Sequence, residues 1–190
     1  MAETWVVILG HQLIFQGMFV MKNFFLQRKT GKQIRGKNIE ATISIAFFAA
    51  FIGAAMWLSV LTQPLGRIHL LNNLLAMTLG LGLLFLSLVV SGASLKNMKD
   101  SWRVGVLEDQ TTDLVTTGIY GFTRNPYFVA YLLMFAGYTV ILQNLILLGL
   151  SIIGFLFVHK MIMKEEKYLF KVHGDVYGNY RAKVPRYILK

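Results

Sequence analysis

The sequence contains no cysteine and few charged residues of either sign. The lack of cysteine excludes disulfides, thiolate metal ligands and a cysteine nucleophile, so any chemistry has to come from other side chains. Only 15% of the 190 residues are charged, whereas a soluble domain carries about 25%. Hydrophobic residues make up 55% of the chain, and the mean hydropathy is +0.56. This composition predicts an integral membrane protein.

Three apolar runs are long enough to cross a bilayer, which takes roughly 20 residues of helix. They cover about 4–27, 41–62 and 70–95. No basic region precedes the first run and no small-residue cleavage pattern follows it, so we expect it to be retained rather than removed as a signal peptide. Gly80 and Gly82 lie inside the third run, where we expect them to let helices pack closely and not to form a dinucleotide-binding loop.

The apolar stretch 127–163 is too long for one crossing, because each helical residue adds about 1.5 Å. Its one polar pair, Gln143-Asn144, predicts a tight turn between spans 127–142 and 145–163. We therefore expect a single all-α domain, residues 1–190, with five transmembrane helices.

The basic residues are unevenly distributed along the chain. Seventeen of the nineteen lie in 28–37, 96–124 and 160–190. These are alternate links, and basic residues favour the cytosolic side, so the pattern predicts an N-terminus outside and a C-terminus in the cytosol. The net charge of +10 then reflects membrane topology and not nucleic-acid binding. We expect a multi-pass protein of a prokaryotic cytoplasmic membrane.

The notable polar residues fall in two stretches on this predicted cytosolic face, 96–126 and 159–190. In the second stretch, four lysines share one helical stripe, which most simply meets lipid phosphates or water. They are Lys160, Lys164, Lys167 and Lys171. We expect the two stretches to form one pocket with its active face toward the cytosol.

Glu165 and Glu166 turn away from the lysine stripe, toward whatever the helix packs against. Inward-facing acids at a membrane boundary are costly unless paired, so both are functional candidates. The alternative is that they form salt bridges with Arg103 or Arg124.

The segment GIYGFTRNPYF, residues 118–128, places Arg124 and Pro126 directly before an apolar run. Proline suits the first turn of a helix, where its missing N–H is not needed. A cation at a helix N-terminus is unfavourable unless an anion accompanies it. The spacing therefore predicts an anion beside Arg124, and a membrane phosphate and a ligand carboxylate both remain open.

Aromatic residues gather on the same face: Trp102, Tyr120, Tyr127, Tyr168, Tyr177, Tyr180 and Tyr187. Interfacial belts explain most of them, and some can stack on a planar base. The two histidines nearby, His159 and His173, are too few and too poorly placed relative to the acids for a convincing metal site, so we expect no metal.

Several motifs of the C-terminal half, residues 96–190, resemble the isoprenylcysteine carboxyl methyltransferase family and the related phospholipid methyltransferases. The matching segments are DSWRVGV (100–106), LVTTGIYGFTRNPYF (114–128), EEKYLF (165–170) and HGDVYGNYRAKVPR (173–186). Three positions depart from the family pattern: Asn125 replaces a histidine, Phe128 a tyrosine and His173 a phenylalanine.

The resemblance implies S-adenosyl-L-methionine as cofactor and a lipophilic acceptor, similar to a prenylcysteine carboxylate or a phospholipid amine, that enters from the bilayer. Expected cofactor contacts are Tyr120, Arg124, Asn125, Pro126, Tyr127, Glu165, Glu166 and Tyr177. Expected catalytic residues are Arg124, Asn125, Glu166 and Arg186, and expected acceptor contacts are Trp102, Arg103 and Tyr180.

Two other functions remain open at this stage. Membrane sterol and steroid reductases look similar over the C-terminal region and bind NADPH there, although five spans and the glutamate pair fit a methyltransferase better. The third reading is a non-catalytic membrane protein whose polar face binds lipid.

Overall fold

All the regular elements in the described part of the chain are helices, as predicted. The computed structural model describes residues 4–31, 34, 39–61, 63–103 and 113–188. Its elements are α1 (Thr4–Thr30), α2 (Ile39–Val60), α3 (Asn73–Asn97), η1 (Lys99–Ser101), η2 (Gly118–Gly121), α4 (Pro126–Leu142) and α5 (Leu145–Lys183). The two η elements are short 3₁₀ turns in the link between α3 and α4.

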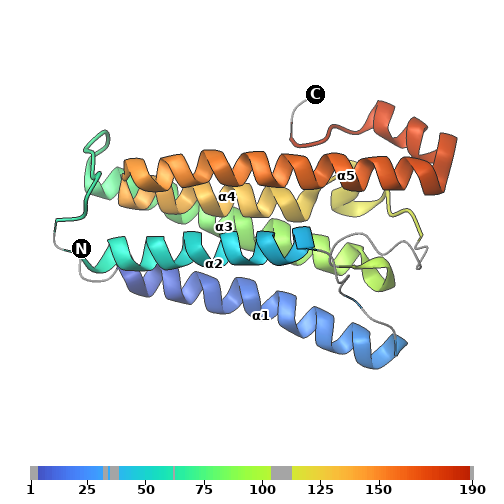
Figure 1. Ribbon diagram of the computed structural model, residues 1–190, viewed down its shortest axis with the longest axis horizontal. Coiled ribbons are helices and arrows are strands. Elements are labelled where there is room, and N and C mark those ends of the chain that lie inside the picture. Colours follow the sequence, from blue (N-terminus) through green and yellow to red (C-terminus); the bar gives the residue numbers. More distant parts are fainter. Residues whose placement is uncertain (1–3, 32–33, 35–38, 62, 104–112, 189–190) are drawn as a thin grey trace.

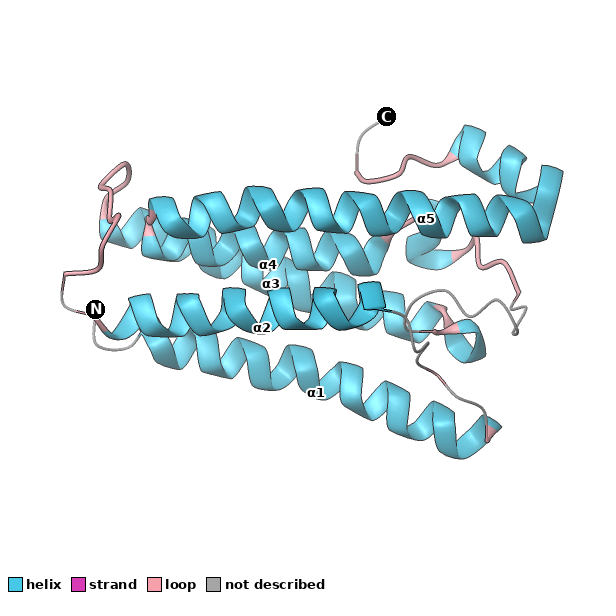
Figure 2. Cartoon of the chain, in the orientation of Figure 1, coloured by secondary structure: helices cyan, strands magenta, loops and turns pink. Residues whose placement is uncertain are grey.

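The five long helices lie side by side and alternate in direction (Figures 1 and 2). The C-terminal ends of α1, α3 and α5 therefore share one end of the bundle with the starts of α2 and α4. Basic residues occupy the last turns of α1, α3 and α5, on the right in Figure 1, and the turn between α4 and α5 lies at the opposite end. We call the first of these the basic end.

The predicted turn at Gln143-Asn144 is confirmed. Gln143 ends α4 in the left-handed conformation, with φ of 45°. The Asn144 side chain caps α5 by accepting the backbone N–H of Ile146 at 2.9 Å and of Leu147 at 3.3 Å. Within the described residues, α1, α2, α3 and α5 are long and apolar enough to cross a membrane, while α4 is a shorter apolar helix of 17 residues.

The most extensive helix contact in the described part of the chain is between α3 and α4, and it includes two glycines. A Cβ added at Gly80 would lie 3.0 Å from the carbonyl oxygen of Gly137 and would collide with the side chain of Ile141. A Cβ at Gly137 would lie 2.7 Å from Leu84. The expected packing role is thus confirmed for Gly80. It is wrong for Gly82, which has open space around it because it faces outward.

A buried polar cluster joins α1 to α4 within the apolar part of the bundle. Nδ1 of His11 lies 2.8 Å from the hydroxyl of Tyr138, and Nε2 of Gln12 donates to the same hydroxyl at 2.8 Å. Hydrogen bonds of this kind hold helices together where water is absent.

Helix α5 continues well beyond residue 163, where the predicted apolar span ends. It bends at Gly174, whose φ of 53° and ψ of −129° are not helical and suit a residue without a Cβ. After the bend the chain turns back along α5 (Figure 1). The hydroxyl of Tyr187 then lies 2.9 Å from Nδ1 of His159, so the tail returns to the basic end of the bundle.

Candidate functional site

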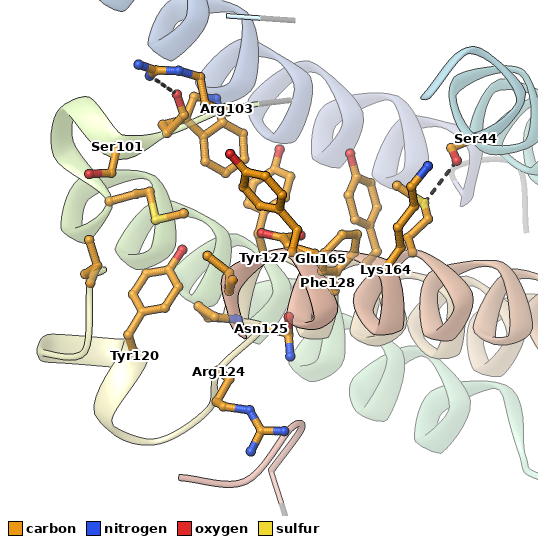
Figure 3. A pocket seen from close by; sticks show the side chains of 18 of the residues that line it. Ser44, Ser101, Arg103, Tyr120, Arg124, Asn125, Tyr127, Phe128, Lys164 and Glu165 are labelled. Carbon is orange, nitrogen blue, oxygen red and sulfur yellow. Dashed lines mark hydrogen bonds between the residues drawn. The ribbon is translucent and has the colours of Figure 1, made fainter. Parts of the chain in front are cut away.

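A cavity of about 350 Å³ lies near the basic end of the bundle (Figure 3). Its walls come from α1, α2, the link between α3 and α4, α4 itself and α5. The two polar stretches singled out in the sequence therefore meet around one hollow.

Ten of the twelve predicted site residues line this cavity. They are Trp102, Arg103, Tyr120, Arg124, Asn125, Pro126, Tyr127, Glu165, Tyr177 and Tyr180. The other two, Glu166 and Arg186, lie behind the wall and contact each other. Adjacent residues of α5 thus have different surroundings, because a helix turns about 100° per residue.

Glu166 is a buried carboxylate held by two guanidinium groups. Arg124 donates to Oε1 from Nη2 at 2.8 Å and from Nε at 3.2 Å. Arg186 donates from Nε to Oε1 at 3.1 Å and from Nη2 to Oε2 at 3.0 Å. The anion expected beside Arg124 is therefore the chain's own Glu166, and the salt-bridge alternative is confirmed for this pair.

The pKa of Glu166 follows from this geometry. Burial alone would raise the pKa of the carboxyl group, but hydrogen bonds from Arg186 and Arg124 outweigh burial and lower the pKa below its ordinary value. Nδ2 of Asn125 adds a further hydrogen bond to Oε1, at 3.3 Å. Glu166 is thus ionised and already supplied with donors by the protein.

The same residues fasten the C-terminal segment 184–186 to the start of α4. The backbone N–H of Arg124 donates to the carbonyl of Pro185 at 3.0 Å, and its Nη1 donates to the carbonyl of Val184 at 2.5 Å. Nδ2 of Asn125 donates to the carbonyl of Arg186 at 3.2 Å. Accordingly, the guanidinium of Arg124 points away from Tyr127 and Glu165 in Figure 3.

Unlike Glu166, Glu165 is not paired with a basic residue. It is half-buried in the cavity wall and has no hydrogen-bond or ion-pair partner among the described residues. Burial, with a smaller contribution from the charge of Glu166, raises its pKa to about 7. An unpaired carboxylate at this position favours a ligand that carries a cation or hydrogen-bond donors.

Two buried hydroxyl groups in the wall are also unsatisfied. The hydroxyls of Tyr127 and Tyr177 have no hydrogen-bond partner of ordinary geometry within the described chain. Buried polar groups are normally paired, so these hydroxyls and Glu165 together leave places for the polar groups of a ligand. By contrast, the hydroxyl of Tyr180 donates to the carbonyl of Tyr120 at 2.7 Å and holds α5 against η2.

An aromatic wall extends the cavity to α1. The ring of Tyr127 lies 4.8 Å from that of Trp102 and 6.2 Å from that of Phe19, between centroids. Nε1 of Trp102 donates to Oδ1 of Asn23 in α1 at 2.8 Å. The first helix therefore contributes directly to the site.

Sequence reasoning missed the residues of α1, α2 and the apolar stretch of α5 that line the cavity. They are Phe19, Ile43, Ser44, Ile45, Phe48, Phe157 and Met161. In an apolar span these residues carry no signal that separates them from ordinary lipid-facing or core positions.

Comparison with known proteins identifies the family. The sequence profile of the phospholipid methyltransferase family matches residues 75–176, more than half of the chain. The chain belongs to the phospholipid methyltransferase family. The match to this family covers α3, α4 and most of α5, and so most of the cavity wall. With its four long apolar helices, this family member is an integral membrane protein.

A curated protein that the chain resembles is also named as a methyltransferase. The chain is 32% identical over 111 residues to a protein-S-isoprenylcysteine O-methyltransferase of Schizosaccharomyces pombe, a stretch that covers 57% of the chain. The match covers 47% of that relative, so the chain spans about half its length.

Proposed function

We propose that this protein is an S-adenosylmethionine-dependent methyltransferase that acts on a lipophilic acceptor in the membrane. The observation that carries the proposal is the unpaired carboxylate of Glu165 inside an aromatic-walled cavity. The family assignment supports it, because the matched residues form most of that cavity.

The residues present suit this cofactor. Its ammonium group and ribose hydroxyls are donors for the carboxylate of Glu165. The hydroxyls of Tyr127 and Tyr177 have free hydrogen-bonding capacity, and the rings of Tyr120 and Tyr127 offer faces for a planar base. Pro126 begins α4 beside them, so free backbone N–H groups of its first turn can bind a carboxylate.

The two glutamates have different roles in this proposal. Glu165 contacts the cofactor, while Glu166 positions Arg124, Asn125 and Arg186 and so fixes the tail against α4. Arg186 is then a positioning residue. The saturated hydrogen bonds of Glu166 support this division over a direct cofactor contact.

Methyl transfer requires mainly that the nucleophile and the methyl carbon are aligned. When bound, the cofactor would supply a methyl group on a sulfonium for transfer to the acceptor. The protein has to hold nucleophile and methyl carbon within about 3–3.5 Å and in line. The rigid wall of Trp102, Tyr127 and Phe19 can provide this alignment and keep water out.

The acceptor enters from the bilayer beside α2. Ile43 and Ile45 line the cavity although 46% and 43% of their surfaces are exposed, so the wall reaches the apolar exterior here. We place all five helices across the membrane, α4 included, with the basic end and the C-terminus in the cytosol. The concentration of basic residues at this end supports that orientation.

Labelled methyl transfer tests the function. The purified protein in liposomes of total membrane lipid is incubated with methyl-labelled S-adenosylmethionine, and the lipids are extracted and separated. A labelled lipid that the Glu165→Ala variant does not produce supports the proposal. If no lipid becomes labelled, but NADPH raises the unfolding temperature and S-adenosylhomocysteine does not, the protein is a reductase instead.

A further inference from the structure

A second, smaller cavity lies at the end of the bundle opposite the basic end. Its volume is about 180 Å³, and residues of α2, of the link between α2 and α3, of α3 and of α4 border it. The polar residues Arg67 and Asn73 line it. Its apolar wall is formed by Leu58, Leu61, Pro64, Met77, Ile141 and Leu142. This cavity shares no lining residue with the proposed cofactor site.

The link that carries Arg67 is held in place by its backbone. The N–H of Ile68 donates to the carbonyl of Gln143 at 2.8 Å, and the N–H of Leu145 donates to the carbonyl of Gly66 at 2.8 Å. The residues on both sides of Arg67 are therefore fixed to the turn between α4 and α5. The position of Arg67 thus does not depend on a contact of its own side chain.

The guanidinium of Arg67 has no counterion in the part of the chain that the structure describes. Arg67 is partly buried, yet no hydrogen bond or ion pair joins its side chain to another described residue. The acidic residues within the described ranges all belong to segments of the basic end: Glu40, Asp100, Asp113, Glu165, Glu166 and Asp175. A partly buried cation without a partner is unfavourable, so this position favours an anion from outside the described chain.

Asn73 adds a second donor to the same cavity. It is the first residue of α3, and the preceding Asn72 already caps this helix by accepting the backbone N–H of Leu75 at 2.8 Å. The side-chain amide of Asn73 is exposed and has no hydrogen-bond partner among the described residues. The cavity therefore presents a guanidinium and an amide that both have free donors.

We propose that this second cavity binds a phosphate group through Arg67 and Asn73. The planar fork of a guanidinium matches two phosphate oxygens, and the amide of Asn73 can donate to a third. A lipid headgroup and free phosphate share this chemistry. In the first case the glycerol carbons would lie against the apolar wall, at Leu58 and Met77. The inference does not rest on the proposed methyl transfer, because the two cavities lie at opposite ends of the bundle.

Binding to the full-length protein in an uncharged detergent at low salt tests this proposal. Calorimetry compares three ligands: dihexanoyl phosphatidic acid, inorganic phosphate and the neutral dihexanoylglycerol. The wild-type protein should bind at least one of the two phosphates more tightly than dihexanoylglycerol. The variant Arg67→Gln should weaken that binding roughly fivefold, as expected for one partly exposed charge, and leave dihexanoylglycerol unaffected.

Lys171→Gln is the matched control. Lys171 is exposed at the basic end and lines neither cavity, so this variant removes the same charge at a different place and should keep the wild-type affinity. A cooperative unfolding transition without ligand shows that Arg67→Gln is folded. Should it fail to fold, Asn73→Ala decides in its place, with an expected loss of about twofold from one exposed hydrogen bond.

Each result supports or overturns the proposal. Tighter binding of dihexanoyl phosphatidic acid than of inorganic phosphate identifies a lipid headgroup, and equal or tighter binding of inorganic phosphate identifies the free anion. Both support a phosphate site if Arg67→Gln weakens it selectively. Equal losses in Arg67→Gln and Lys171→Gln would overturn the proposal, since net charge alone would explain them. Unchanged affinity in Arg67→Gln, or no binding of either phosphate, would overturn it as well.

Discussion

Arg186 holds Glu166 with two parallel hydrogen bonds, from Nε to Oε1 at 3.1 Å and from Nη2 to Oε2 at 3.0 Å. This bidentate pair joins the last described segment of the chain to the middle of α5. Arg124 approaches the same carboxylate from the start of α4. One buried acid thus ties together three parts of the site.

Replacing Arg186 by alanine should loosen the tail. The variant loses the bidentate pair, and because the Arg186 side chain is 31% exposed, the loss should be moderate, about 2 kcal/mol of unfolding free energy. Thermal unfolding in detergent should show a fall of roughly 4–8 °C, and limited proteolysis should cleave near residue 184 sooner. Lys183→Ala, at an exposed neighbouring position, is the control and should change neither.

The substitution Glu166→Gln should destabilise the protein, because two guanidinium groups would remain without their shared carboxylate. Breaking a largely buried ion pair in this way costs about 2–4 kcal/mol. Thermal unfolding measures it, with Glu165→Gln as the matched control on the neighbouring residue. If Glu166→Gln unfolds at the wild-type temperature and only its cofactor binding is lost, the positioning role is incorrect.

Cofactor affinity should rise between pH 6 and pH 8. The pKa of Glu165 is raised to about 7, so its carboxylate is mostly protonated at pH 6 and mostly ionised at pH 8. If the ionised form binds the ligand, affinity for S-adenosylhomocysteine should increase roughly tenfold over this range, as measured by calorimetry. Glu165→Gln should flatten the profile.

The stability of the ligand-free protein should move the other way. A raised pKa in the folded state means that the contribution of Glu165 to stability is present below the ordinary carboxyl pKa and is lost as the pH rises through about 7. Unfolding temperatures of wild type and Glu165→Gln, compared at pH 6 and pH 8, test this. An equal difference at both pH values would contradict it.

Much of this architecture could be predicted from the sequence, because hydropathy and helix length constrain a membrane chain strongly. The turn at Gln143-Asn144 was predictable from one polar pair in a long apolar run. The meeting of Arg124 with Glu166 of α5 followed from placing both residues on one membrane face.

The different surroundings of Glu165, which is unpaired, and Glu166, which is ion-paired, could not be predicted. They depend on the rotation of α5 and on the return of the tail after Gly174, and both are set by tertiary packing. The contributions of Phe19 and Ser44 were hidden for a related reason, since periodicity does not say which face of an apolar helix borders a cavity.

Close packing of α3 on α4 should fail when Gly80 acquires a side chain. Gly80→Val would collide with Ile141 and approach the Gly137 carbonyl, at a cost of about 1–3 kcal/mol. Gly82→Val is the matched control in the same helix, where nothing lies within 4 Å. Thermal unfolding should separate the two, and similar unfolding temperatures would argue against a tight α3–α4 contact.

The most direct test of the proposed cofactor site is equilibrium binding of S-adenosylhomocysteine to the full-length protein in detergent at pH 8, with NADPH measured alongside. We expect saturable binding at one site, weakened at least tenfold by Glu165→Gln, and no binding of NADPH. Unchanged affinity in Glu165→Gln, or binding of NADPH in place of S-adenosylhomocysteine, would contradict the assignment of this cavity.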